Sequence, residues 1–310
     1  MTDLLQLNPD KPISLPGIKC AYCGCAIGGK TSTNDHVVGR KFVPESTIGN
    51  GFNLQVKACE TCNGKKAQLE DDISIITMLP DTAGRYVRED ERLVRTVARK
   101  AKGAISPATR RLAAQSYNEI KARVPVGGGV SLTYSGIAMP TLEDQRVAHL
   151  AFYHVQGFSF LRSYDKARQH GAWLEPAKFL MLGQLTRPDW GNPQLRHFTA
   201  VTREWECINL MNMADGYFRH AMFKAPDVEL WAWALEWNER LRVFGLYGKA
   251  EAKDRFAADM PAVPVDFSSG DTTNGFMFRI ETPIGDDEDD LLFAAPDGLA
   301  ERRFAPPHWR

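Results

Sequence analysis

Two Cys-x-x-Cys pairs near the start of the chain limit its fold more than any other feature of the sequence. Cys20 and Cys23 form the first pair, and Cys59 and Cys62 form the second. Each such turn brings two thiolates together, and two turns complete the tetrahedral four-sulfur set that Zn²⁺ prefers in structural sites. The spacing therefore predicts a structural zinc site, with Cys25 as an alternative ligand to Cys23.

The segment around these cysteines, residues 18–78, is polar and has little continuous apolar periodicity. A unit of this size has too small a core to be stable alone, so a bound metal would stabilise it. The chain has 6 cysteines in 310 residues, which is too sparse for a disulfide scaffold. Outside the zinc site, Cys25 and Cys207 are expected to behave as small apolar residues.

The composition indicates a globular protein with one large or two modest cores, since 44% of the residues are hydrophobic and 25% are charged. The first residues lack a basic start followed by an apolar run, and no stretch approaches the roughly 18 apolar residues of a membrane helix. We therefore expect a cytoplasmic protein without membrane contact. Lys+Arg and Asp+Glu both total 38, so a polyanion would have to bind a local basic patch.

Three short polar motifs lie between the cysteine pairs and just after them. They are Asp35-His36, Asn53-Leu54 and Asn63-Gly64-Lys65-Lys66, the last of which directly follows Cys62. Together with the cysteines, this order of motifs resembles the HNH endonucleases over about residues 18–75. The resemblance implies a ββα-metal fold, in which two strands and a helix surround one catalytic divalent cation.

The residue types in these motifs suit phosphodiester hydrolysis. An imidazole can take a proton from water near neutral pH, and carboxylate and amide oxygens are ligands that Mg²⁺ or Mn²⁺ accepts. By resemblance, His36 is the general base and Asn53 braces the loop that carries it, while Asp35 and Asn63 bind the catalytic Mg²⁺ or Mn²⁺. Neighbours in a regular strand face opposite ways, so Asp35 and His36 converge only at a twisted or bulged strand end.

Two positions depart from the commonest pattern of that family. Asn63 stands where the last His often stands, which makes the site an H-N-N variant consistent with magnesium. Gly39 stands where many relatives carry Pro. We therefore expect a more flexible loop after His36.

The residues after these motifs favour a helix from about Asp81 to Lys102, because apolar and arginine side chains fall on opposite sides of a helix. The arginine row could lie along a phosphate backbone, and a solvated face explains it equally well. The candidate nucleic-acid contacts in this row and beside the site are Arg40, Lys41, Lys65, Lys66, Arg88, Arg92, Arg95 and Arg99.

The sequence as a whole predicts an α+β protein, in which the ββα-metal module precedes a mixed helical and antiparallel-sheet domain. Helices are expected from Thr141 to about His170 and over residues 176–185, and a switch to strand periodicity is expected from His197. Strands are expected over residues 130–134, 218–225, 231–237, 240–247 and 275–281. Trp231, Trp233 and Trp237 could stack exposed bases, but core positions are the favoured interpretation.

These patterns divide the chain into four parts. We expect a zinc-stapled nuclease module at residues 1–80, a basic helical linker at 81–125, an accessory or target-recognition domain at 126–285 and a loose acidic tail at 286–310. The expected function is metal-dependent HNH cleavage of DNA, with DNA and a protein of a bacterial anti-phage or restriction system as partners. The alternatives are a catalytically silent, zinc-stapled nucleic-acid-binding module and an RNA nuclease or toxin.

Overall fold

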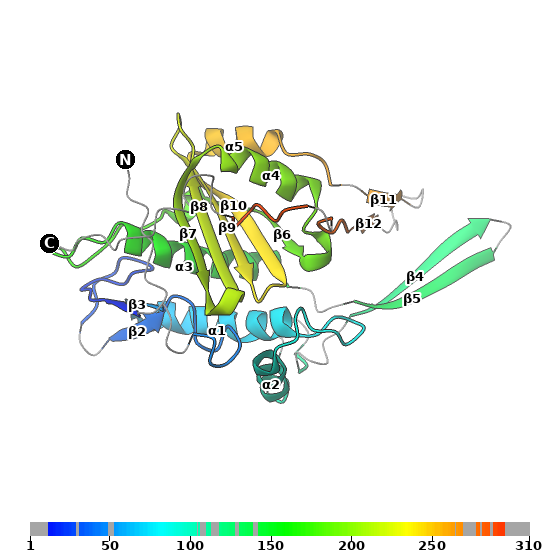
Figure 1. The fold of residues 1–310 in the computed structure, drawn as a ribbon, viewed down its shortest axis with the longest axis horizontal. Helices are drawn as coiled ribbons and strands as arrows, with labels where there is room; N and C mark the ends of the chain where they lie inside the picture. Colours follow the sequence, from blue (N-terminus) through cyan, green and yellow to red (C-terminus); the bar gives the residue numbers. More distant parts are fainter. Residues whose placement is uncertain are drawn as a thin grey trace.

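The N-terminal part of the chain folds as a small sheet followed by a long helix. The structure, a computed structural model, describes residues 12–28, 31–48, 53–103, 105, 110–112, 118–127, 130–138, 142–263, 265–268, 277–279, 281–285 and 288–294. Strands β2 (Ser32–His36) and β3 (Leu54–Cys59) pair antiparallel, β1 (Ile13–Leu15) joins β3 in parallel, and α1 (Glu60–Met78) follows. The order of β2, β3 and α1 is compatible with a ββα unit (Figure 1).

Helix α1 begins at the second cysteine pair and ends in the core. Cys59 is its N-cap, and the Cys59 sulfur accepts a hydrogen bond from the backbone N–H of Cys62 at 3.4 Å. The helix ends before Leu79, because the following residue, Pro80, disfavours a helical conformation at Leu79. All residues from Asp72 to Met78 are buried, so this half of α1 is covered on every side, as expected for a central helix.

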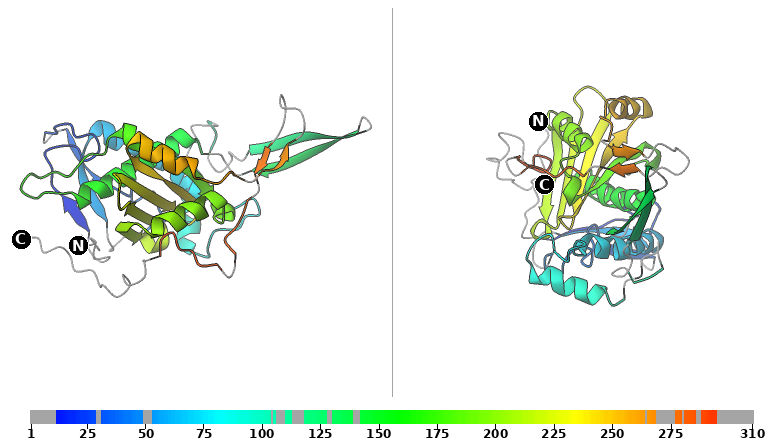
Figure 2. Two further views of the ribbon diagram at one scale, coloured as in Figure 1. Left: turned by 90° about the horizontal axis from the view of Figure 1, so that it is seen from above. Right: turned by 90° about the vertical axis from the view of Figure 1, so that its right-hand side faces the viewer.

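A five-stranded antiparallel sheet forms the centre of the remaining chain. In spatial order its strands are β6 (Phe179–Thr186), β10 (Leu241–Gly248), β9 (Leu230–Trp237), β8 (Phe218–Lys224) and β7 (Glu206–Met213). Helix α3 (Asp144–Arg162) packs on one face, and α4 (Pro193–Arg203) and α5 (Ala250–Ala258) pack on the other (Figures 1 and 2). Because side chains alternate along a strand, Trp233 and Ala234 enter different hydrophobic clusters.

The strands expected between residues 218 and 247 are confirmed. Trp233 and Trp237 are fully buried, which confirms the core interpretation for these two rings, while Trp231 is half-buried against Tyr247. The turn between β9 and β10 contains Asn238, whose φ of 53° is left-handed. Strand β5 (Val130–Ala138) includes the strand predicted over residues 130–134.

Other elements differ from the sequence-based expectations. Residues 176–185 are predicted to be helical, but after one 3-10 turn (Pro176–Lys178) they form β6, because this segment pairs with β10 along its length. Such pairing overrides local propensity. Helix α3 ends well before His170, and Thr141 lies outside the described residues. Helix α4 covers His197, so the switch to strands expected at His197 comes only with β7.

The helix predicted from Asp81 is shorter than expected, because α2 spans only Glu91–Lys100. The Asp81 carboxylate accepts hydrogen bonds from the backbone N–H groups of Ala83 and Arg85, which forms a turn instead of a helix. The Asp90 carboxylate then caps α2 by accepting from the N–H of Arg92 at 2.8 Å.

One hydrophobic cluster runs from the N-terminal unit into the sheet. It contains Val37 directly after β2, Ile73 in α1 and Trp237 in β9. The fully buried Asn238 donates hydrogen bonds to the carbonyl of Phe42 at 3.1 Å and to the Thr77 hydroxyl at 2.8 Å. The N-terminal unit therefore shares a core with the sheet.

The remaining described elements lie at the periphery. Strands β4 (Asn118–Gly127) and β5 form a hairpin that extends away from the body (Figures 1 and 2), and β11 (Val265–Ser268) pairs with β12 (Met277–Arg279), within the segment predicted as a strand. The acidic tail is predicted to be loose, but in its described part Asp290 pairs with Arg242 and Leu292 is buried. Among the described residues, no helix has both the length and the apolar character needed to cross a membrane.

Candidate metal centre and nuclease site

The four cysteines predicted to bind zinc lie together. Their sulfur atoms are all within 4.8 Å of one another; the four residues are Cys20, Cys23, Cys59 and Cys62. A tetrahedral Zn²⁺ with bonds of about 2.3 Å holds its sulfurs about 3.8 Å apart, and the sulfurs of Cys23 and Cys59 are 3.9 Å apart. This cysteine cluster therefore fits a structural metal such as zinc, whereas Cys25 is exposed and is not one of the four, although its thiol contacts those of Cys23 and Cys59.

The local backbone explains how the cysteine cluster forms. Gly24 closes the first turn by donating its N–H to the carbonyl of Cys20 at 2.9 Å, and its φ of 73° suits glycine. The N–H of Ala21 donates to the carbonyl of Lys57 at 2.8 Å, which ties this turn to β3. Burial raises the pKa of Cys59, but hydrogen bonds from the start of α1 outweigh it and lower the pKa to about 7.

The cysteine cluster is supported by α3 and the segment that follows it. The Trp173 indole donates to the carbonyl of Cys20 at 2.8 Å, and its ring packs on Gly24. Gln156, which is fully buried, donates to the carbonyl of Ala21 at 2.8 Å and accepts from the N–H of Leu174 at 2.6 Å. Helix α3 and the segment that follows it thus contact the backbone of the first cysteine pair directly.

Asp35 faces α1 and is almost completely buried. Its carboxylate accepts a hydrogen bond from the Tyr22 hydroxyl, and the same oxygen lies 3.3 Å from the ammonium of Lys66. Burial raises the pKa of Asp35, although the positive charge of Lys66 opposes this shift. Asp35 is therefore already held by two protein groups.

Lys66 connects the end of β2 to α1. Its side chain is fully buried, and its ammonium donates to the carbonyl of His36 at 2.7 Å and to the carboxylate of Glu70 at 2.8 Å. Glu70 in turn accepts from the N–H of Gly39 at 3.0 Å and lies 3.5 Å from the imidazole of His154. Burial raises the pKa of Glu70, but Lys66 and His154 lower it to about 2 overall.

His36 ends β2 with its imidazole partly exposed. The side-chain amide of Gln55 lies 3.3 Å from Nε2 of His36. Neither Nδ1 of His36 nor Oδ1 of Asn53 has a hydrogen-bond partner in the described part of the chain. Asn53 is nevertheless close enough to the imidazole to raise its pKa. Burial lowers the pKa of His36 more than Asn53 raises it, so the neutral imidazole is favoured at neutral pH.

The bulge that would let Asp35 and His36 converge does not occur. The pairing of β2 with β3 runs without interruption from Ser32 to His36, so Asp35 and His36 project to opposite faces of the hairpin. Asn63 lies in the first turns of α1, three residues before Lys66, and therefore on the side of the helix that carries Lys66 to Asp35.

The loop after His36 is held, in contrast to the flexible loop expected from Gly39. The N–H of Gly39 donates to Glu70, and proline has no N–H to make this bond. A Cβ at this position would lie 2.4 Å from a carboxylate oxygen of Glu70. The absence of proline therefore has a local physical reason in this chain.

Several candidate phosphate contacts are engaged within the protein. Lys66 is fully buried, so the expectation that it contacts nucleic acid is wrong. The Arg88 guanidinium pairs with Glu239 at 2.8 Å and lies over the ring of Tyr217, while Arg92 pairs with Asp90 and Asp215. These two arginines join the start of α2 and the residues before it to the turns after β7 and β9, which breaks the predicted arginine row. Arg95 contacts the carbonyl of Glu91, and Arg99 pairs with Glu45 at the surface.

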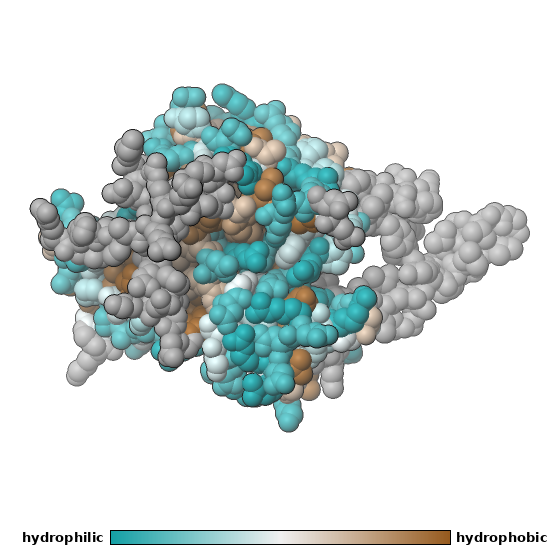
Figure 3. Space-filling model, viewed as in Figure 1, coloured by the Kyte–Doolittle hydropathy of each residue, from teal (hydrophilic) through white to brown (hydrophobic). Residues whose placement is uncertain are grey.

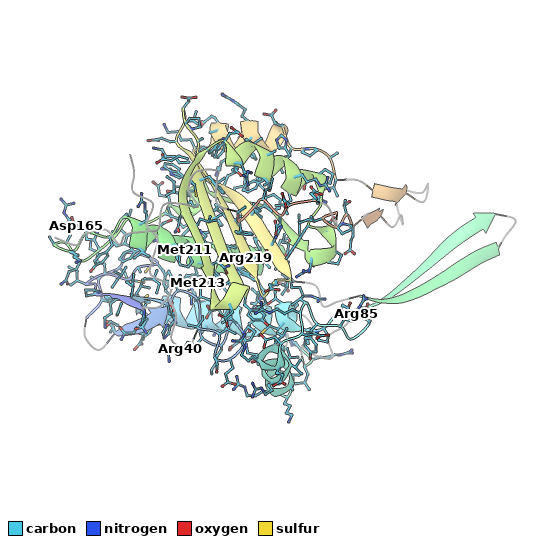
Figure 4. The ribbon with its side chains drawn as sticks, in the orientation of Figure 1. Arg40, Arg85, Asp165, Met211, Met213 and Arg219 are labelled. Atoms are coloured by element: carbon cyan, nitrogen blue, oxygen red, sulfur yellow. The ribbon has the colours of Figure 1, made fainter. Side chains whose placement is uncertain are left out.

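Two further candidates, Arg40 and Lys41, line a cavity of about 960 Å³ beside α1, which we call the basic cavity. Figure 4 shows Arg40 beside α1 on the side where α2 packs, and the surface over α2 is largely hydrophilic in Figure 3. Burial lowers the pKa of Lys100 to about 8, and its ammonium donates to the carbonyl of Lys41. The basic residues that line the cavity are Arg40, Lys41, Arg99, Lys100 and Arg146, beside the acidic Glu45, Asp71 and Asp72.

Sequence reasoning missed Tyr22, Gln55, Glu70 and His154, all of which contact the candidate site. Glu70 had a detectable signal, because it follows Lys66 by four residues, the spacing of a helical ion pair. Tyr22 and His154 had none, since their contacts depend on packing between distant segments. No protein-family model, curated protein or solved structure matches this chain, so its functional interpretation rests on the chemistry of the site.

Proposed function

We propose that this protein is a metal-dependent endonuclease of the HNH type that hydrolyses DNA phosphodiester bonds. The observation that carries the proposal is the position of His36, at the end of β2 in a unit whose other end holds the cysteine cluster. Its neutral imidazole can accept a proton from an attacking water. The attacking water would take the place of the Gln55 side-chain amide, which now lies beside Nε2 of His36.

The donor set of Asp35 and Asn63 suits a hard cation such as Mg²⁺ or Mn²⁺. A bound cation would supply stabilisation of the negative charge that develops on the phosphate. Lys66 lies 3.3 Å from Asp35 and competes for its oxygen. We therefore expect the free protein to bind Mg²⁺ weakly, since Mg²⁺ commonly relies on substrate phosphates for part of its coordination.

The decisive experiment compares cleavage by the intact protein and by His36→Ala in the presence of Mg²⁺. Loss of a general base lowers hydrolysis by about 100-fold to 10,000-fold, and the zinc content and thermal unfolding should not change. Supercoiled DNA, linear DNA and RNA are supplied in parallel to identify the nucleic acid. His197→Ala on α4 serves as the matched control and should cleave like the wild type.

Asn63→Ala should weaken cleavage less than His36→Ala and should recover partly at higher Mg²⁺ or Mn²⁺, because it removes a ligand and leaves the base. Cleavage by His36→Ala at the native rate would refute the assignment of the base. A second candidate function is a zinc-stapled module that binds nucleic acid without cleaving it. It is favoured by the hydrogen bond from Tyr22 and the ion pair with Lys66, which already occupy the Asp35 carboxylate. It predicts binding of nucleic acid with no cleavage under either metal.

A further inference from the structure

A second cavity, of about 830 Å³, lies between α1, α3 and the segment from Trp173 to Phe179. We call it the aromatic cavity. Its size falls in the range of small-molecule sites, which are mostly apolar with a few polar groups at defined positions. Five rings line it: Tyr22, Phe152, Tyr153, Trp173 and Phe179.

The rings are fixed by the core behind them. Phe179 stacks on the fully buried Trp233, with ring centroids 4.5 Å apart and an angle of 10° between the planes. Phe152 meets Phe179 edge-on at 5.3 Å, and Tyr153 meets Tyr22 edge-on at 5.0 Å. A flat ligand would therefore meet rings that are already ordered, which lowers the entropic cost of binding.

The basic groups of the aromatic cavity favour an anionic ligand, and Cys23 and Cys62 of the cysteine cluster form another part of its wall. Lys65 and His149 are exposed, and Lys65 forms no ion pair with any residue that the structure describes. Arg146 also lines the cavity, where it pairs with Asp72 at 2.5 Å. Gln68 adds an amide that can donate and accept hydrogen bonds. This combination of rings, an amide and an exposed ammonium matches a nucleotide.

The aromatic cavity adjoins the basic cavity, because Gln68 and Arg146 line both. A polymer that places one unit among the rings can therefore pass over α1 toward Arg40 and Lys41. Nucleic acid has this pattern, with flat bases attached to a chain of phosphates, and base stacking on aromatic rings together with a basic groove is how proteins bind single strands.

We propose that the aromatic cavity receives an unpaired nucleobase of the bound strand, while its backbone continues along the basic cavity. The proposal rests on the proposed function and narrows its substrate class to nucleic acid with a single-stranded or unpaired segment. A base inside an intact duplex is stacked on both sides and would have to leave the stack to enter.

The test measures binding by fluorescence anisotropy with the His36→Ala protein, so that no cleavage occurs and no chelator is needed that would remove zinc. The probes are a labelled single-stranded 12-mer of DNA, the same 12-mer of RNA, an abasic backbone of equal length and charge, and a blunt DNA duplex. Stacking of a base contributes about 1 to 3 kcal/mol, so we expect the base-bearing strands to bind about tenfold tighter than the abasic one.

Two variants separate the base from the phosphate. Phe152→Leu keeps an apolar side chain but removes a ring face, and it should reduce the preference over the abasic strand without changing abasic affinity. Lys65→Glu should weaken the binding of both the base-bearing and the abasic strand. Matched controls are Phe293→Leu, on the opposite side of the sheet, and Lys249→Glu, in an exposed ion pair with Glu229; both should bind like the parent.

Equal affinity for base-bearing and abasic strands overturns the proposal, as does a base preference that Phe152→Leu leaves unchanged. Tighter binding of the duplex than of the single strand also overturns it. These outcomes are independent of the proposed nuclease activity, because the assay contains no cleavage step. If the protein prefers base-bearing strands but the wild type never cleaves, the proposed nucleobase site stands and only the proposed nuclease activity is refuted.

Discussion

Lys65 and Lys66 are neighbours in sequence, but the structure gives them opposite roles. Lys65 is exposed, whereas the side chain of Lys66 is fully buried between Asp35 and Glu70. A buried cation is tolerated only when it is paired and hydrogen-bonded, and Lys66 makes three such contacts, one of them to the carbonyl of His36. Lys66 therefore fixes the end of the strand that carries the proposed base.

Replacing Lys66 by methionine should strongly destabilise the protein. The change leaves the charges of Asp35 and Glu70 buried without their shared cation, and breaking a buried pair in this way costs about 3 to 5 kcal/mol. Urea unfolding at pH 7 measures the effect. Lys65→Met removes the same charge from the exposed position and should stay within about 0.5 kcal/mol of the wild type. Equal midpoints for the two variants would contradict this account of Lys66.

At the scale of elements, α3 supports the backbone of the cysteine cluster, although Gln156 lies 135 residues after Ala21 in the sequence. Gln156 joins the first cysteine turn to the segment after α3 through its hydrogen bonds to Ala21, Ala172 and Leu174. Because zinc binding and folding of such a unit are coupled, a change in α3 should reach the metal.

Gln156→Leu should speed the loss of zinc and lower the unfolding free energy. It leaves buried backbone groups without partners, each of which costs about 1 to 3 kcal/mol. Zinc release to a colorimetric chelator and the total zinc per chain provide the measurement. Gln194→Leu is the control, since Gln194 bonds to the carbonyl of Pro261 on the other side of the sheet. Equal release rates for the two variants would show that α3 does not support the cysteine cluster.

The role expected for α2 also changes, since Arg88 before the helix and Arg92 in its first turn are paired with Glu239 and Asp215 in the turns beside the sheet. We therefore expect nucleic acid to follow the basic cavity. Reversing Arg40 and Lys41 to glutamate should weaken binding of unrelated sequences alike and flatten its salt dependence, because lost phosphate contacts release fewer counterions. Arg95→Glu, on exposed α2, should change the salt slope less. Binding isotherms at several salt concentrations distinguish the two paths. A larger effect of Arg95→Glu would show that the nucleic acid follows α2 and not the basic cavity.

At the scale of the whole molecule, the sequence predicted what local spacing controls. The cysteine cluster, the strands between residues 218 and 247 and the burial of Trp233 follow from spacing, period and turn residues. The helix predicted over residues 176–185 does not form, because pairing with β10 makes most of that segment a strand. The burial of Lys66 and the contact of Gln156 with Ala21 could not be predicted, since they depend on how α1 and α3 meet the hairpin in space.

The same shared core should make the protein sensitive to acid. His154 and His220 are fully buried, and burial lowers their pKa values to about 4 and about 3. In the unfolded chain a histidine has a pKa of about 6.5. Below about pH 6.5 the unfolded state therefore binds more protons than the folded state. The two histidines leave the unfolding free energy undiminished above that pH, and they lower it progressively as the pH drops toward 4.

Each histidine should contribute a slope of about 1.4 kcal/mol per pH unit in this range. Urea unfolding between pH 7.5 and pH 4.5, with zinc content measured at each pH, tests the effect. His220→Leu should remove one histidine's share of the slope, whatever its stability at pH 7.5, while His197→Leu on α4 should keep the wild-type slope. If His220→Leu retains the full slope, the acid sensitivity comes from other groups, such as the thiolates of the cysteine cluster, and not from the shared core.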